Sequence, residues 1–209
     1  MRRATSLLVT LTLGAILASC SDQGAGTPTI APTATSQVSS GTSATTGAPA
    51  NGAPKVEVPL DISRFQQAPC EVLTSEQVTM IFNAEVSPTS DVNGPSGPAC
   101  SWSAGLPTRA SVSVIFPKVY EGLGAIYGNK NNSAYFQPLD PIQGYPVVAS
   151  NKLVDDRNAG ACRLNVGTSD TTTANVNIQL SEDKVGKKDP CQAAHDIATM
   201  VISTIKGAQ

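Results

Sequence analysis

The 209-residue sequence has few of the residues from which metal sites, catalytic sites and nucleic-acid-binding surfaces are built. It has one histidine, no C-x-x-C pair among its cysteines, and an aromatic content of only 4%. Its 14 lysines and arginines are not clustered and are outnumbered by 16 acidic residues, which argues against nucleic acid as a partner. We therefore expect no metal, no cofactor and no nucleic-acid partner.

The sequence also lacks a hydrophobic run long enough to cross a membrane. The apolar run from Leu7 to Leu17 has eleven residues, which as a helix would cover about 17 Å of the ~30 Å hydrocarbon core. Arg2 and Arg3 precede this run, and small residues follow it, as in a secretory signal peptide. We therefore expect residues 1–19 to be removed on export.

The segment from Leu17 to Cys20 resembles the lipobox of bacterial lipoproteins. This resemblance implies cleavage before Cys20, diacylglycerol on its sulfur, and N-acylation with a further chain such as palmitate. Two or more acyl chains give stable anchoring, whereas one gives only marginal binding. The sequence thus predicts lipidation at Cys20 and a location on the extracytoplasmic face of the cell membrane.

Residues 20–57 are rich in Thr, Ser, Pro, Gly and Ala, and Asp22 is the one charged residue between Ser21 and Pro54. Such a segment buries too little apolar surface to offset the entropy of ordering it, so we expect a disordered tether. A flexible chain of roughly 35 residues spans about 30–35 Å. Residues 58–209 then form one extracytoplasmic domain.

Four cysteines remain once Cys20 is lipidated, and an even number in an exported chain favours two disulfides. Three pairings are possible. We favour the two local ones, Cys70–Cys100 and Cys162–Cys191, each closing a loop worth roughly 3–4 kcal/mol in the chain-entropy model.

Helix signals flank the domain. Thr74 followed by Gln77 forms a capping box at the start of one helix. A last helix begins with Asp189 as N-cap and Pro190 at its first position, with Gln192 completing a second capping box, and it ends near Gly207.

Between these helices the sequence alternates as strands do. We expect a hairpin from residues 99–104 and 110–116, a strand at 145–150, and a second hairpin from 161–167 and 174–180. In the second hairpin polar residues occupy one face, so this part of the sheet is expected to be covered on one side only. The fold class is α+β: a single domain with an antiparallel sheet of about five strands packed with N-terminal and C-terminal helices.

Five segments that surround the four cysteines and the central Gly-Tyr-Pro-Val carry a resemblance: "APCEVLTSEQV", "GPACSW", "GYPV", "ACRLNV" and "DPCQAAHDIATMVI". In this order, across residues 65–206, they resemble the actinobacterial lipoproteins grouped as domain of unknown function 3558. The resemblance implies an actinobacterial cell envelope and one small disulfide-stapled domain. It implies no activity.

No complete catalytic set is visible. His195 lies on the last helix, where its sequence neighbour Asp196 points about 100° away and cannot orient it. Two S-x-x-K matches, "SEDK" and "STIK", lack the partner motifs of penicillin-binding enzymes. Asp155 and Asp156 could bind a cation or act as an acid–base pair, but a solvated loop is favoured.

The aromatic residues are unevenly distributed. All four tyrosines and one phenylalanine fall in a stretch that carries Gly, Asn and Pro: Tyr120, Tyr127, Tyr135, Phe136 and Tyr145. Tyrosine combines a large contact area with a polar tip, so these residues form a candidate binding surface. The alternative is that the rings pack the segment onto the sheet.

The leading functional hypothesis is a non-enzymatic, membrane-anchored module that binds an envelope protein, glycan or lipid. The alternative is an envelope hydrolase or transferase whose site, built from Asp, Ser and Tyr, sequence spacing does not reveal. A third possibility is an accessory role beside a transporter or sensor.

Overall fold

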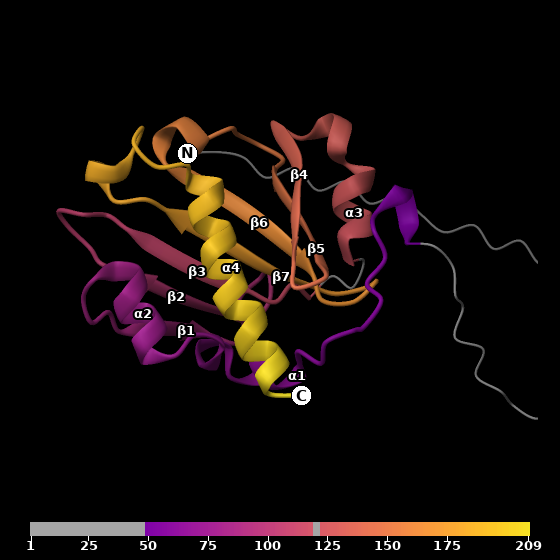
Figure 1. The fold of residues 1–209 in the computed structure, drawn as a ribbon, viewed down its shortest axis with the longest axis horizontal. Coiled ribbons are helices and arrows are strands. Elements are labelled where there is room, and N and C mark those ends of the chain that lie inside the picture. Colours follow the sequence, from indigo (N-terminus) through magenta and orange to yellow (C-terminus); the bar gives the residue numbers. More distant parts are fainter. Residues whose placement is uncertain (1–48, 119–121) are drawn as a thin grey trace, which may run out of the picture. The chain divides into compact units, whose positions relative to one another are not determined.

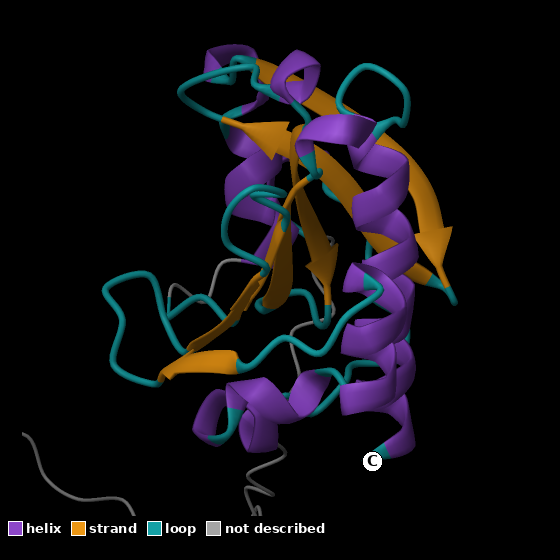
Figure 2. Cartoon of the chain, turned by 90° about the vertical axis from the view of Figure 1, so that its left-hand side faces the viewer, coloured by secondary structure: helices purple, strands orange, loops and turns teal. Residues whose placement is uncertain are grey.

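The computed structural model describes residues 49–118 and 122–209. The predictions for Cys20 and Tyr120 fall outside these ranges. The described chain folds into a seven-stranded antiparallel sheet with helices on both of its faces (Figures 1 and 2). The α+β class is confirmed, but the strands number seven rather than five.

The strands are β1 Pro88–Asp91, β2 Ala99–Ser103, β3 Ser111–Ile115, β4 Tyr135–Ile142, β5 Tyr145–Asn151, β6 Ala161–Gly167 and β7 Thr173–Gln179. They are ordered β1-β2-β3-β7-β6-β5-β4, and every neighbouring pair is antiparallel. The predicted hairpins are β2–β3 and β6–β7, and in the second Cys162 lies opposite Ile178. Both hairpins are therefore confirmed.

The two strands that the sequence did not predict are the two edge strands. β1 is exposed along its whole length and begins with Pro88, while β4 contains Pro138 and Pro141. Proline cannot donate a ladder hydrogen bond and is confined to edges, bulges and strand ends. The prolines and polar residues that are tolerated at a sheet edge interrupt the alternation of polar and apolar residues, so the sequence pattern did not predict these two strands.

The helices are α1 Ser63–Gln67, α2 Ser75–Phe82, α3 Gly122–Gly128 and α4 Pro190–Gly207, and short 3₁₀ turns occupy Ala50–Gly52, Pro69–Val72, Lys130–Asn132, Arg157–Ala159 and Glu182–Lys184. The capping box of α2 is confirmed: the Gln77 amide donates to Thr74 Oγ1, and the Thr74 amide donates to Gln77 Oε1.

The predicted start of α4 is confirmed, but the capping box predicted for this helix is wrong. The Asp189 carboxylate accepts hydrogen bonds from the amides of Cys191 and Gln192, and Pro190 occupies the first turn. The Gln192 side chain turns away and donates to Asp196 Oδ1 at 3.0 Å. Asp189 already satisfies two first-turn amides, and the glutamine forms an i,i+4 pair on the helix surface instead.

The second face of the sheet is covered in part. Residues around Ala53 and helix α3 pack over β5 and β6, where Val148 of β5 is fully buried and the paired Asn165 of β6 is 8% exposed. Ala53 and Val56 are buried as well, so residues 53–57, which the sequence assigned to the tether, belong to the packed domain. The sequence predicted that this face of the second hairpin is uncovered, and that prediction is wrong where α3 packs on the sheet.

The structure contains the two local disulfides, Cys70–Cys100 and Cys162–Cys191. The first joins the 3₁₀ turn before α2 to β2, and the second joins β6 to the first turn of α4. Such bonds are typical of proteins in an oxidising, extracytoplasmic compartment. In the described ranges, no helix has the length and hydropathy that crossing a bilayer requires.

Candidate functional site

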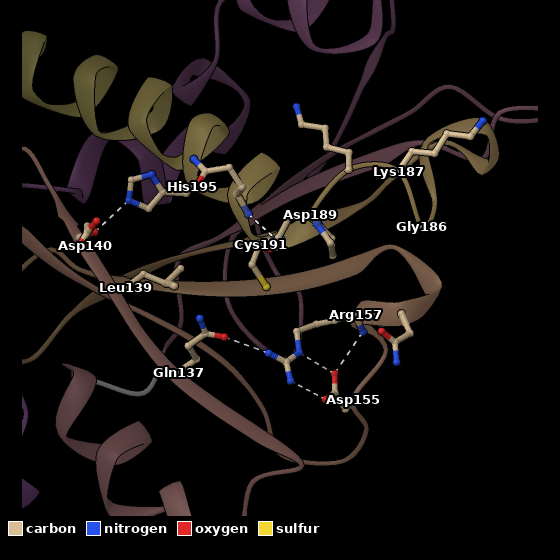
Figure 3. A pocket seen from close by; sticks show the side chains of 14 residues that line it. Gln137, Leu139, Asp140, Asp155, Arg157, Gly186, Lys187, Asp189, Cys191 and His195 are labelled. Carbon is tan, nitrogen blue, oxygen red and sulfur yellow. Dashed lines mark hydrogen bonds and ion pairs between the residues drawn. The ribbon is translucent and has the colours of Figure 1, made fainter.

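A large, mainly polar cleft opens beside the N-terminal end of α4 (Figure 3). Its volume is about 770 Å³, and three separate segments line it: the middle of β4, the loop after β5 around Arg157, and residues 186–195. The cleft lies at the edge of the sheet, because β4 is an edge strand. We take it as the candidate functional site.

The helix side of the cleft is fixed covalently. Cys191 lines the cleft and is bonded to the buried Cys162 of β6. Asp189 accepts two first-turn amide hydrogen bonds, at 2.7 and 3.1 Å. The helix start therefore presents its own carboxylate to these amides, so they are not available to an external anion.

The opposite side is held by Arg157. Its Nε and Nη2 atoms donate to the two carboxylate oxygens of Asp155 at 2.8 and 2.7 Å, and Nη1 donates to Gln137 Oε1 at 3.1 Å. Its guanidinium carbon lies 4.4 Å from the centre of the Tyr135 ring. A planar guanidinium suits both a bidentate carboxylate and an aromatic face, so Arg157 fastens the loop to β4.

His195 connects the two sides. Its Nε2 atom donates to the backbone carbonyl of Asp140 at 3.0 Å, which joins the second turn of α4 to β4 (Figure 3). Because a carbonyl only accepts, Nε2 carries a proton in this hydrogen bond. The histidine thus has a structural partner on β4.

Several polar groups in the cleft remain available to a ligand. The ion pairs among residues 49–118 and 122–209 include neither Lys187 nor Lys188, and the Asn158 side chain has no hydrogen bond there. Gln137 uses its oxygen for Arg157 and keeps its Nε2 donors. Amide and ammonium donors on a prearranged frame are suited to binding a polar ligand.

Two of the three carboxylates that line the cleft, Asp155 and Asp189, do not resemble a general acid. Hydrogen bonds from the Arg157 side chain lower the pKa of the Asp155 carboxyl, whereas a carboxylic acid that donates a proton near neutral pH needs a raised pKa. Asp189 is engaged by the helix amides. Across the described residues, no group of three or more His, Cys, Asp or Glu is arranged to hold a metal ion.

The structure places two of the candidate aromatic residues in the core. Tyr135 and Tyr145 are each 5% exposed, so neither ring offers a binding surface. The Tyr135 hydroxyl accepts a hydrogen bond from the Arg163 amide, and burial raises the pKa of Tyr135. For these two residues the packing alternative is correct, because their rings fill space beneath α4 and the loop of Arg157.

Tyr127 and Phe136 lie on the other face of the sheet. Their ring centres are 5.0 Å apart, with the planes at 89° to each other, in an edge-to-face pair. They pack against the small cluster of Ala53, Leu123 and Val148 and stay partly exposed. The structure therefore does not bring the predicted aromatic surface together as one site.

The sequence did not point to the cleft residues Gln137, Asn158 and Lys187. They come from three segments that are distant along the chain, and each is an ordinary surface residue in its own segment. A usable signal did exist: the Cys162–Cys191 pairing together with the Asp189 cap fixes the start of α4 beside the loop that precedes β6.

Comparisons with known proteins agree with the sequence resemblance. No curated protein and no solved structure matches the chain. One family, described as "Protein of unknown function (DUF3558)", matches residues 15–204. This match covers all four disulfide cysteines, the cleft and nearly the whole described domain, and the chain therefore belongs to the DUF3558 family.

Proposed function

We propose that this protein is a membrane-anchored, extracytoplasmic binding protein that takes a polar ligand into the cleft beside α4. The observation that carries the proposal is the cleft itself, with its volume of about 770 Å³ and donor groups from three segments. This volume lies within the range of about 300–1,000 Å³ that is usual for ligand sites.

The frame of the cleft supports ligand binding because it is fixed before any ligand arrives. The Cys162–Cys191 bond, the Arg157 contacts and the hydrogen bond of His195 hold its sides in place. A site that is already ordered loses less conformational entropy when a ligand binds, so more of the contact energy appears as affinity.

Binding is favoured over catalysis because three of the cleft groups that could transfer protons already have other partners, which leaves the Asp140 carboxylate without a paired base or acid beside it among the described residues. Asp155 is paired with Arg157, Asp189 caps the helix, and His195 donates to a backbone carbonyl. The remaining groups, Lys187, Lys188, Asn158 and Gln137, are hydrogen-bond donors that suit recognition.

The proposed anchor rests on the sequence. The apolar run before Cys20 and the small residues next to it fit a lipoprotein signal, and the low-complexity chain up to residue 57 fits a tether. Two disulfides fit an exported domain. An acylated Cys20 would keep the cleft near the membrane surface.

Nuclear magnetic resonance on the 15N-labelled mature chain, made lipid-free by Cys20→Ser, tests the cleft. The probes are inorganic phosphate, glucuronate and N-acetylglucosamine. At least one probe should shift amide signals from three segments together, because these segments share the cleft: residues 137 and 139–140, 157–158, and 186–189 with 191–192. If all three probes leave these signals unmoved, the proposed polar-ligand site is rejected.

Matched variants assign such shifts to the cleft. Lys187→Gln and Asn158→Ala should weaken binding of the probe that shifts the spectrum, because both residues line the cleft. Lys118→Gln removes a lysine that is exposed and does not line it, so it should leave the affinity unchanged.

A further inference from the structure

A second groove, with an apolar floor and a mixed polar and apolar lining, runs between α2 and α4. Its volume is about 270 Å³, and its floor is formed by Val112 of β3 and by Ile178 and Leu180 at the end of β7. Figure 1 shows β3 passing between the two helices at this place. The groove lies on the α4 side of the sheet but is lined by a largely different set of residues from the polar cleft.

The two helices place apolar side chains on the walls of the groove. Phe82 from α2 and Met200 from α4 face it and are only partly buried, and Met80 at its border is 66% exposed. Methionine side chains adapt readily to irregular apolar partners. An apolar surface left open between two helices in this way is typical of a binding groove rather than of a finished core.

One part of the lining is cationic. Lys184 and Lys188 both line the groove, and neither takes part in an ion pair within the described residues. One acidic residue, Asp196, lines the groove as well and accepts a hydrogen bond from Gln192. Asp183 lies close enough to Lys184 to interact with its charge, and it bonds to Ser181. Two ammonium groups beside an apolar trough complement a ligand with an anionic head and an apolar chain.

We propose that this groove binds a fatty acid, with the chain between α2 and α4 and the carboxylate at Lys184 and Lys188. The volume of about 270 Å³ is just below the usual range for ligand sites, which suits one acyl chain better than a two-chain lipid. This binding activity is separate from the polar cleft and goes beyond the function proposed above.

The test is calorimetric titration of the lipid-free mature chain (Cys20→Ser) with dodecanoate, below the concentration at which dodecanoate forms micelles. Dodecanoate should bind with one site per chain. Dodecyl maltoside, with the same chain and an uncharged head, should bind more weakly, and dodecyltrimethylammonium more weakly still, because its head repels the lysines. Equal affinity for all three would overturn the carboxylate assignment.

Two matched pairs of variants locate the site. Met80→Glu should abolish dodecanoate binding, whereas Val58→Glu should not, because Val58 is equally exposed at 69% but does not line the groove. Lys184→Gln and Lys188→Gln should each weaken binding about two- to fivefold. Lys187→Gln, which changes a lysine of the cleft alone, should leave dodecanoate binding intact.

Two results would contradict the proposal. One is unchanged dodecanoate binding in Met80→Glu with a native thermal transition. The other is a concentration-dependent dimer of the parent chain that Met80→Glu dissociates, which would make a second copy of the chain the occupant. Lys187 lines only the cleft, so Lys187→Gln should change binding of the polar probes and leave dodecanoate binding unchanged. The two proposals can therefore fail independently of each other.

Discussion

The guanidinium of Arg157 lies 4.4 Å from the centre of the Tyr135 ring and forms a bidentate pair with Asp155. These contacts fasten the loop after β5 to the edge strand β4. β4 contains two prolines, which cannot donate the hydrogen bonds needed to pair with a further strand. It also explains why Tyr135 is buried although it belongs to a segment that is rich in turn-forming residues.

Replacing Arg157 by lysine should lower the free energy of unfolding by about 1–2 kcal/mol, because lysine keeps the charge but loses the planar contact with Tyr135 and the second bond to Asp155. Urea denaturation measures this loss. Arg109→Lys, in an exposed pair with Glu182, is the control and should change stability by less than about 1 kcal/mol. If both variants lower the free energy of unfolding equally, the Arg157 contacts stabilise the fold no more than an exposed ion pair does.

The strands that the sequence predicted are the interior ones, β2, β3, β5, β6 and β7. In β6 and β7 the alternation is produced by burial: Leu164 and Val176 on one side are fully buried, while Arg163 on the other is exposed. β5 is buried on both faces and shows almost no alternation. β1 and β4 have one hydrogen-bonding partner and more solvent, so polar residues and prolines are tolerated, and the period of two disappears. The capping box of α2 was predictable from the sequence as well, because Thr74 and Gln77 are only three residues apart.

The Cys162–Cys191 bond should contribute more to the cleft than the Cys70–Cys100 bond. Removing either pair by double alanine substitution should cost roughly 3–4 kcal/mol, because the sequence separations of 29 and 30 residues close loops of similar entropy. Only the loss of Cys162–Cys191 should also weaken binding in the cleft, since Cys191 lines it.

Urea denaturation and the probe titrations on the two double variants check this prediction. Loss of cleft binding in the Cys70→Ala/Cys100→Ala protein, under conditions in which it is folded, would contradict it.

The candidate site was harder to predict than the fold because it is an assembly of separate segments. The clustering of tyrosines in the sequence was real, but Tyr135 and Tyr145 are buried while Tyr127 contacts Phe136 on the opposite face. Residues that alternate along one strand point to opposite sides of a sheet, so neighbours such as Tyr135 and Phe136 cannot share one surface. The cleft depends on where α4 begins relative to β6, and in the sequence only the pairing of Cys162 with Cys191 links these two segments.

The Asp155 carboxyl should titrate below its ordinary value of about 3.9, because its hydrogen bonds from Arg157 lower its pKa in the folded state. A depressed folded-state pKa gives stability that is present above the unfolded value and is lost as pH falls through the folded one. Titration of the carboxyl 13C signal by magnetic resonance measures it. Arg157→Gln should return the pKa toward the ordinary value; an unchanged titration in this variant would show that Arg157 is not the cause.

Lipidation at Cys20 is the prediction on which the membrane location depends. Cells that express the full chain and are fed an alkyne analogue of palmitate should yield a labelled protein in the membrane fraction. Cys20→Ala should give an unlabelled protein, because the acylated sulfur is removed. Cys70→Ala/Cys100→Ala is the matched control, since these cysteines form a disulfide in the domain and should not accept lipid. Labelling that persists in Cys20→Ala would place the acyl chain elsewhere and remove the basis for the anchor.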